Sequence, residues 1–550
     1  MYFLLKNLCD KIGCEKKIYI YGAGKYATEI YNKLCIIGWK DRIKNFVVTF
    51  IGTQLPYIDD IPVIEFDTQT FADTDNIILV AVSEAYVEEI RDKLRTISPE
   101  KVLYLLDFIG STDNRLERLL SSSFDEFCNA ALDEYIWRNP QNFNNKENLK
   151  NNLQQLLQKY KNKNVQDKSI TYIIEEETAR DIKIIRALLE KGYNIKVLQY
   201  AVKAKYVAEK ELLNMNILTE RFECAWEFMI KSLKHKPCLY FFDTEASFEC
   251  ASVAIRYRDI WGKVVVAPYE TFIGCFINIS ENVINEEKFC LENADAVVWR
   301  YFSKEYLERK MGYRFKGESI HLLDNCGGYE LPSRIKECSS DGRLKLCCVV
   351  AQIGCFLCED SSVYTRQAKF IDILDSMDES CELNVFAWSA SADEERQLAD
   401  LQRKYKNFKY FLKVEHRDLI CRISACDYGL CVWTNEQIPD YPVGAEVLAG
   451  GIFTCTEGSY RYSVANRYFD YIDAELPIIT TLPEKLCDYL QQYDVIVRMN
   501  SSNLDVDYLK KNKDYYKKKA KAAKTELLMS KHINILTDLF ESVCAEKNMF

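Results

Sequence analysis

Residues 463–483 constrain the fold most, because a helix pattern runs there directly into a strand pattern. Apolar and aromatic side chains recur at the spacing of one helix face, at Val464, Tyr468, Tyr471 and Ile472. Pro477 ends the helix, and the β-branched run at 478–481 is typical of a buried strand. A helix followed at once by a buried strand predicts one helix–strand unit of an α/β fold.

Two charged residues of this helix, Arg467 and Asp470, are three positions apart and therefore share one face. A polar helix start with a basic residue, and an acidic residue one turn later, would suit a nucleotide diphosphate. Arg467 and backbone N–H groups near Ser463 and Asn466 would hold phosphate, and Asp470 would accept hydrogen bonds from ribose hydroxyls. The alternative is a surface Arg–Asp pair on an ordinary amphipathic helix.

The bulk composition is that of an ordinary globular protein. Of 550 residues, 48% are apolar and 28% are charged, and about three or four domains are expected for this length. The net charge of −10 argues against nucleic acid as the main partner. No signal peptide or bilayer-length apolar run is apparent, so the 22 cysteines are interpreted as reduced thiols in a cytoplasmic protein.

Residues 1–110 are expected to form a Rossmann-like domain. Strand patterns alternate there with helix patterns, at 17–21, 46–49, 77–82 and 102–106. The first strand leads into a G-x-G-x-x-A loop with Gly22, Gly24 and Lys25, where glycines let a ligand phosphate approach a helix N-terminus. The acidic residue that NAD-binding domains carry after the second strand is absent, since Thr49 is the only polar residue there. A binding or structural role is favoured over NAD chemistry, which stays open.

Residues 111–168 are rich in Asn, Gln and Lys and predict a linker with a helical part. Residues 169–335 alternate strands and helices again, which predicts a second α/β domain. Asp243, Glu245 and Glu270 come directly at the ends of strand patterns, where open α/β sheets bind their ligands. Glu270, or with less support Asp243, is therefore a candidate catalytic base. The alternative is helix capping or solvated loop charge.

Residues 336–502 show the same alternation and predict a third α/β domain, with a loop at Gly354 that would approach a donor phosphate. The tail, residues 503–550, is predicted to be helical. It carries a run of lysines, at Lys510, Lys511, Lys513, Lys517, Lys518, Lys519, Lys521 and Lys524. Such runs are mostly solvated helix faces, and the alternative is attraction to an anionic membrane surface.

Motifs for metal and other catalysis are missing or misplaced. The cysteines nearest to a zinc pattern are Cys347, Cys348, Cys355 and Cys358. The first two are neighbours in an apolar strand and point to opposite faces, so four converging ligands are not expected. The D-x-D triplets at 73–75 and 505–507 do not follow apolar strands, and no P-loop or G-x-S-x-G turn occurs. We therefore expect chemistry without a metal or cofactor.

Residues 466–479 resemble the donor-binding helix and following strand of GT-B glycosyltransferases, especially bacterial enzymes of the GT4-like group. The pattern is a polar, a basic, an aromatic and an acidic residue and a tyrosine, followed by proline and a hydrophobic strand. Here these are Asn466, Arg467, Phe469, Asp470, Tyr471 and residues 476–479. Glu475 departs from the pattern, where Gly is usual. Residues 294–297 and 424–430 also resemble strand entries of the two GT-B lobes.

Residues 20–34, IYGAGKYATEIYNKL, resemble the small N-terminal domain of PglD-type sugar acyltransferases, in which a similar loop meets a nucleotide-sugar. The hexapeptide-repeat β-helix of those enzymes is missing from this chain, so the resemblance does not imply acyl transfer.

The GT-B resemblance implies two Rossmann-like lobes with a cleft between them, behind the separate N-terminal domain, and a last helix that crosses back onto the first lobe. It implies transfer of a sugar from a nucleotide-sugar donor to a hydroxyl of a glycan or lipid-linked acceptor, in bacterial surface polysaccharide or glycoconjugate assembly. The misplaced D-x-D triplets favour a metal-independent transfer. The nucleobase would lie near Glu415 and His416, and Arg467 would stabilise the leaving diphosphate. Two alternatives remain: an NAD(P)-dependent oxidoreductase or epimerase that uses the Gly22 loop, and a non-catalytic scaffold that binds nucleotide-sugars.

Overall fold

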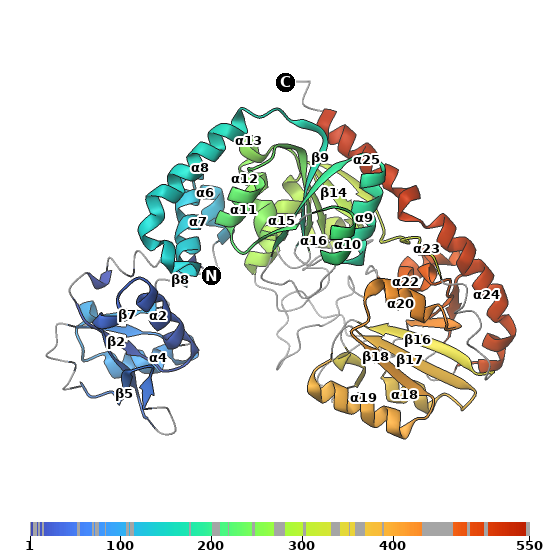
Figure 1. Ribbon diagram of the computed structural model, residues 1–550, viewed down its shortest axis with the longest axis horizontal. Helices are drawn as coiled ribbons and strands as arrows, with labels where there is room; N and C mark the ends of the chain where they lie inside the picture. Colours follow the sequence, from blue (N-terminus) through green and yellow to red (C-terminus); the bar gives the residue numbers. More distant parts are fainter. Residues whose placement is uncertain are drawn as a thin grey trace. The chain divides into compact units, whose positions relative to one another are not determined.

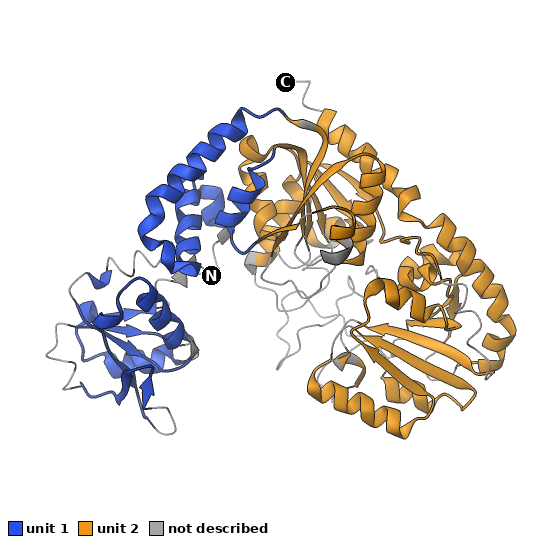
Figure 2. Cartoon of the chain, viewed as in Figure 1, with its two compact units in different colours: residues 1–164, 222–235 blue, residues 165–221, 236–550 orange. Residues whose placement is uncertain are grey.

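The computed structural model of the chain divides into two compact units (Figures 1 and 2). The first comprises residues 1–164 and 222–235, and the second comprises residues 165–221 and 236–550. The structure describes residues 2–3, 8, 11–13, 16–51, 56–68, 71, 76–82, 84–105, 109–110, 115–174, 178–200, 209–217, 219–244, 248–268, 281–300, 304–331, 342–350, 353–357, 369–387, 390–431, 466–480, 485–499 and 504–545.

The first unit contains a six-stranded sheet of order β4-β5-β3-β2-β6-β7, as the alternating pattern predicts for a Rossmann-like domain. Its strands are β2 (Ile18–Tyr21), β3 (Ile43–Val48), β4 (Tyr57–Ile58), β5 (Ile61–Glu65), β6 (Ile77–Val80) and β7 (Val102–Tyr104). All pairs are parallel except β4 with β5. Helices α2 (Lys25–Ile36) and α4 (Glu84–Leu94) connect strands of this sheet.

Gly22 lies where β2 and β6 separate at the carboxyl end of this sheet. Its φ is +122°, and a Cβ atom there would be 2.7 Å from the carbonyl oxygen of Ala81. Gly22 thus lets the chain turn against the neighbouring strand, which is a packing reason for the first glycine of the loop. The side chain of Lys25 lies outside the described residues.

Helices occupy most of the Asn- and Lys-rich region. They are α6 (Arg115–Ser121), α7 (Phe124–Arg138) and α8 (Lys146–Lys161). Ser123 begins α7 with a reciprocal capping box to Glu126. The inserted helix α11 (Ala225–Ser232) packs on α7, where the sulfur atoms of Cys128 and Met229 are 3.9 Å apart. The short strands β1 (Tyr2–Phe3) and β8 (Ile109–Gly110) pair antiparallel.

The second unit begins with a lobe built on a seven-stranded sheet of order β11-β10-β9-β12-β13-β14-β15, called here the first lobe. Its strands are β9 (Gln166–Ile174), β10 (Asn194–Tyr200), β11 (Thr219–Phe222), β12 (Pro237–Thr244), β13 (Val264–Pro268), β14 (Ala296–Trp299) and β15 (Glu318–His321). Its helices are α9 (Ala179–Glu190), α10 (Glu209–Asn214), α12 (Glu249–Arg256), α13 (Arg258–Trp261), α15 (Glu281–Asn293) and α16 (Lys304–Met311). The chain reverses its direction of travel across the sheet between β9 and β12.

The second lobe is built on a six-stranded sheet of order β18-β17-β16-β19-β20-β21, whose strand pairs are all parallel. Its strands are β16 (Leu344–Val350), β17 (Cys381–Ala387), β18 (Phe408–Leu412), β19 (Tyr428–Cys431), β20 (Ile478–Thr480) and β21 (Ile496–Arg498). Its helices are α17 (Gly354–Leu357), α18 (Phe370–Asp375), α19 (Ala392–Lys404), α20 (His416–Ile423), α22 (Arg467–Asp473) and α23 (Lys485–Gln491). The fold is therefore α/β, with two Rossmann-like lobes after a separate Rossmann-like domain.

Two long helices end the chain, α24 (Val506–Glu526) and α25 (Met529–Ala545) (Figure 1). Leu509 and Ala520 of α24 are buried in the cores of the second lobe. Ile533 and Phe540 of α25 are buried in the core of the first lobe. Among the described residues, no helix combines the length and the apolar character that crossing a membrane would need.

The lysine run of α24 divides into two groups. Four lysines make contacts within the second unit: Lys513 and Lys517 with Asp427, Lys519 with Asp494, and Lys524 with backbone carbonyls. The other four are exposed beside exposed acidic residues of the same helix, such as Asp507 and Asp514. A surface of mixed charge supports contact with an anionic membrane less than a purely basic surface would.

Candidate functional site

The carboxyl end of the second lobe has the geometry of a ligand site. The chain forms β16, β17 and β18 on one side of the sheet and then crosses to β19 on the other side of β16. Open α/β sheets bind their ligands outside the strand ends at this reversal. Helix α22 begins here, because it leads into β20, the strand beside β19.

Arg467 lies at this reversal point. Its Nη1 donates a hydrogen bond of 3.3 Å to the carbonyl oxygen of Val349, near the end of β16. The guanidinium also adjoins the buried thiol of Cys348, where burial raises the pKa of the thiol to about 11 and Arg467 opposes the rise. Arg467 is half-buried rather than turned to bulk solvent, and its charge is held at the strand ends.

Tyr471 fixes α22 over the same point. Its hydroxyl accepts a hydrogen bond from the backbone N–H of Val349 (2.9 Å) and donates one to the carbonyl oxygen of Leu430 (3.0 Å). The hydroxyl thus bridges β16 and β19 just beyond their last paired residues, Cys347 and Gly429. A Cβ atom on Gly429 would be 2.3 Å from the Tyr471 ring, so the glycine makes room for the ring.

Asp470 is buried and already has partners. The distance from its Oδ1 to Nε2 of His416 is 3.0 Å, and to Nζ of Lys183 it is 3.8 Å. Burial alone would raise the pKa of Asp470, but His416 and then Lys183 outweigh it, so the pKa is lower than usual. His416, predicted near the nucleobase, therefore lies beside the predicted ribose acceptor, and Glu415 immediately precedes α20.

Asp243 lies at the corresponding reversal point of the first lobe, at the end of β12. Its carboxylate forms a buried ion pair with Arg180, and the Tyr172 hydroxyl is 3.5 Å away. Burial, and after it the carboxylate of Asp181, raise the pKa of Asp243 well above its usual value, while Arg180 opposes the rise. A paired, buried carboxylate is poorly placed to take a proton from an acceptor, so this geometry favours a structural role for Asp243.

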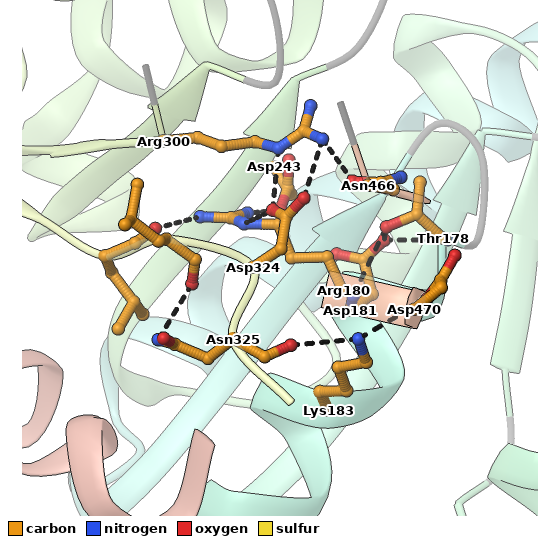
Figure 3. Close-up of polar contacts among 12 residues, drawn as sticks. Thr178, Arg180, Asp181, Lys183, Asp243, Arg300, Asp324, Asn325, Asn466 and Asp470 are labelled. Carbon is orange, nitrogen blue, oxygen red and sulfur yellow. Dashed lines mark hydrogen bonds and ion pairs between the residues drawn. The ribbon is translucent and has the colours of Figure 1, made fainter. Parts of the chain in front are cut away.

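Alternating charges run from this point to the start of α22 (Figure 3). Arg180 lies between Asp243 and Asp324, with its Nε 3.3 Å from Asp324 Oδ1. Arg300, which directly follows β14, donates two hydrogen bonds of 2.6 and 2.7 Å to Asp324. Arg300 also donates to the side-chain oxygen of Asn466, the residue before α22. Asn466 therefore contacts the first lobe.

Several predicted site residues lie outside the described part of the chain: Glu245, Glu270 and Ser463. Gly354 begins the four-residue helix α17, after β16. The structure therefore brings together Arg467, Asp470, His416 and Asn466 around α22, and it places Asp243 in the first lobe's ion-pair network.

Sequence reasoning missed Arg180, Lys183, Arg300 and Asp324. Arg300 directly follows a strand, so the strand-end rule that selected Asp243 would also have found it. Arg180 and Lys183 lie within a helix, where charge is ordinarily solvated, and no local pattern marks them as buried. Cys347 and Cys348 belong to different cores, and the described residues contain no group of His, Cys, Asp and Glu that would hold a metal.

The chain matches no protein-family model and no curated protein sequence. Similar solved structures include the sucrose-phosphate synthase of Thermosynechococcus elongatus, with 12% identity and a TM-score of 0.47 over 69% of this chain and 100% of that one. Anabaena HepE in complex with UDP has 11% identity and a TM-score of 0.48 over 68% and 99% of the two chains. The UDP-GlcNAc 2-epimerase of Methanocaldococcus jannaschii has 10% identity and a TM-score of 0.36 over 67% and 99%.

Proposed function

We propose that the second unit is a glycosyltransferase that moves a sugar from a nucleotide-sugar donor to an acceptor hydroxyl. The observation that carries the proposal is the position of Arg467 at the chain-reversal point of the second lobe, with its guanidinium held at the strand ends by Val349. The guanidinium of Arg467 at this point can bind a diphosphate and stabilise the negative charge that develops as the sugar leaves.

The donor would be held by residues around α22. In the proposed complex, Arg467 binds the diphosphate and Asp470 orients a ribose hydroxyl, with His416 keeping the carboxylate ionised. We keep the sequence-based assignment of Gly354 and Ser463 to the phosphate and of Glu415 to the base. On the acceptor side we retain Glu270 as the candidate base, and we assign Asp243 to orienting Arg180.

The acceptor class belongs to the proposal as well: a hydroxyl of a glycan or lipid-linked glycan in bacterial surface polysaccharide or glycoconjugate assembly, without a metal cofactor. Support for this class is the resemblance of residues 466–479 to the donor segment of GT4-like enzymes. Peripheral membrane contact through α24 has less support, because acidic residues share its exposed surface.

The test is incubation of the protein with UDP-, GDP- and TDP-sugars, with detection of released nucleotide and of altered sugar. We expect one donor class to release nucleotide, and Arg467→Ala to lower the rate by about 100-fold or more, the scale of losing one charge-stabilising group. Arg467→Lys should retain part of the activity. The matched control is Arg396→Ala, because the Arg396 side chain is 76% exposed on the same lobe.

Two results would contradict the proposal. Release that Arg467→Ala leaves unchanged would show that the guanidinium does not act on the leaving group. Conversion of the donor sugar without nucleotide release would favour an epimerase.

A further inference from the structure

Lys183 is a buried lysine of α9 in the first lobe, and its ammonium group faces the second lobe (Figure 3). Its Nζ donates a hydrogen bond of 2.9 Å to the carbonyl oxygen of Asn325, in the segment that follows the last strand of the first lobe. The same nitrogen is 3.8 Å from Asp470 and 3.8 Å from Asp473, both on α22. A single cation of the first lobe thus lies against two carboxylates of the helix that carries Arg467.

The surroundings of Lys183 explain why it carries its charge despite burial. Burial alone would lower the pKa of the ammonium, but Asp470 and then Asp473 more than compensate and raise it. Asp473 in turn accepts backbone hydrogen bonds from Gly327 and Gly328, the second of 3.0 Å. The carboxylates of α22, the segment at 325–328 and α9 therefore form one connected charged cluster.

We propose that Lys183 is a positioning residue of the donor site: from the first lobe it sets the orientation and charge of Asp470, and through them the binding of the nucleotide. The inference rests on the proposed function, because it assigns Asp470 to the ribose. Removal of the ammonium would leave Asp470 and Asp473 buried with less positive charge nearby. The ionised form of Asp470, which accepts the ribose hydroxyl, would then be less favourable. His416 would remain as the second partner of Asp470.

The groups that face this cluster come from several elements. They are His416 of α20, Asp470 and Asp473 of α22, Cys326 and Tyr329 of the segment after β15, and Lys524 of α24. Lys524 offers a matched control, because its Nζ donates to the carbonyl oxygens of Asp473 and Tyr329, both at 2.6 Å. Lys524 therefore contacts α22 through a backbone carbonyl, whereas Lys183 faces the carboxylates of that helix.

The experiment measures the affinity of UDP, GDP and TDP between about pH 3 and pH 8 for the full chain and its variants, an interval that brackets the ordinary carboxyl and imidazole pKa values of about 4 to 6.5. For Lys183→Met we expect affinity about tenfold weaker at neutral pH. We also expect the acid limb, the fall of affinity on acidification, to move up by about one pH unit. Lys183→Arg should restore most of both, since it restores the charge. Lys524→Met should leave the acid limb where it is in the natural protein.

The assignment is overturned if Lys183→Met leaves the acid limb in place. It is also overturned if Lys524→Met moves the acid limb as far as Lys183→Met does. If the natural protein binds none of the nucleotides, the proposed function itself fails, and this inference fails with it. Binding by the natural protein with unchanged affinity in Lys183→Met would refute the positioning role alone. If Lys183→Met does not fold, the double variant Lys183→Met with Asp473→Asn removes one buried charge of each sign, and we expect it to show the same shift of the acid limb.

Discussion

At the scale of single residues, burial decides what each charged group of the candidate site can do. Arg467 keeps an exposed part and holds its guanidinium at the strand ends, as a phosphate ligand must. Asp243 has a comparable place in the first lobe, but it is buried and its carboxyl group is already paired with Arg180 inside the protein. Asp470 stands between these cases, because it is buried yet kept ionised by its neighbours.

The lowered pKa of Asp470 makes a prediction about stability. A carboxyl whose pKa is lower in the folded state stabilises that state above its unfolded pKa of about 4, and this stabilisation is lost as the pH falls through the folded-state pKa. Asp470→Asn should therefore unfold about 1–3 kcal/mol more easily at neutral pH, the scale of a lost hydrogen bond to a charged group. The difference should shrink on acidification, as urea denaturation at a series of pH values would show. A constant difference down to pH 3, roughly one unit below the ordinary pKa of an aspartate, would mean that Asp470 is not held ionised by His416 and Lys183.

At the scale of elements, the second lobe places α22 by inserting one side chain between two strands. Tyr471 passes over Gly429 and bridges the backbones of β16 and β19 with its hydroxyl. This insertion lets α22 lie close to the sheet, so that Arg467, one helical turn earlier, reaches the end of β16. The contact joins α22 to β16 and β19, so substitutions at this contact should change both the stability of the lobe and the position of the helix.

We therefore expect Gly429→Ala to destabilise the second unit by about 1–3 kcal/mol, the usual cost of overpacking a core. Nucleotide affinity should fall as well, because the helix has to move away from the strands. Tyr471→Leu should cost stability by itself but relieve part of the clash, so the two changes should not add. A double-mutant cycle by urea denaturation measures this coupling, and strict additivity would contradict the contact.

At the scale of the whole molecule, the chain forms two units with separate cores, and the candidate site belongs to one of them. Residues Val47, Phe71 and Val80 belong to a core of the first unit. The cores of the second unit include residues from both lobes and from the terminal helices. The candidate donor residues all belong to the second unit.

Calorimetry of the full chain should therefore show two unfolding transitions. The donor nucleotide should raise the midpoint of one of them and leave the other in place, because a ligand stabilises only the unit that binds it. The stabilisation is about 2.7 kcal/mol when the nucleotide is at about 100 times its Kd. NADH should move neither transition. An NADH-dependent shift of a transition would favour the oxidoreductase alternative, in which the Gly22 loop is the working site.

The sequence by itself determined the elements and the strand ends. Period-two and period-3.6 patterns are local, so they predicted three α/β regions. The strand-end rule selected Asp243, and the spacing of Arg467 and Asp470 on one helix face selected the segment around Arg467. Tertiary structure alone decided which of these charges are paired inside the protein. Lys183 meets Asp470, and Arg300 meets Asn466, only because folding brings two lobes together, and no local pattern records the burial or the partner of a charge that lies so far away in the chain.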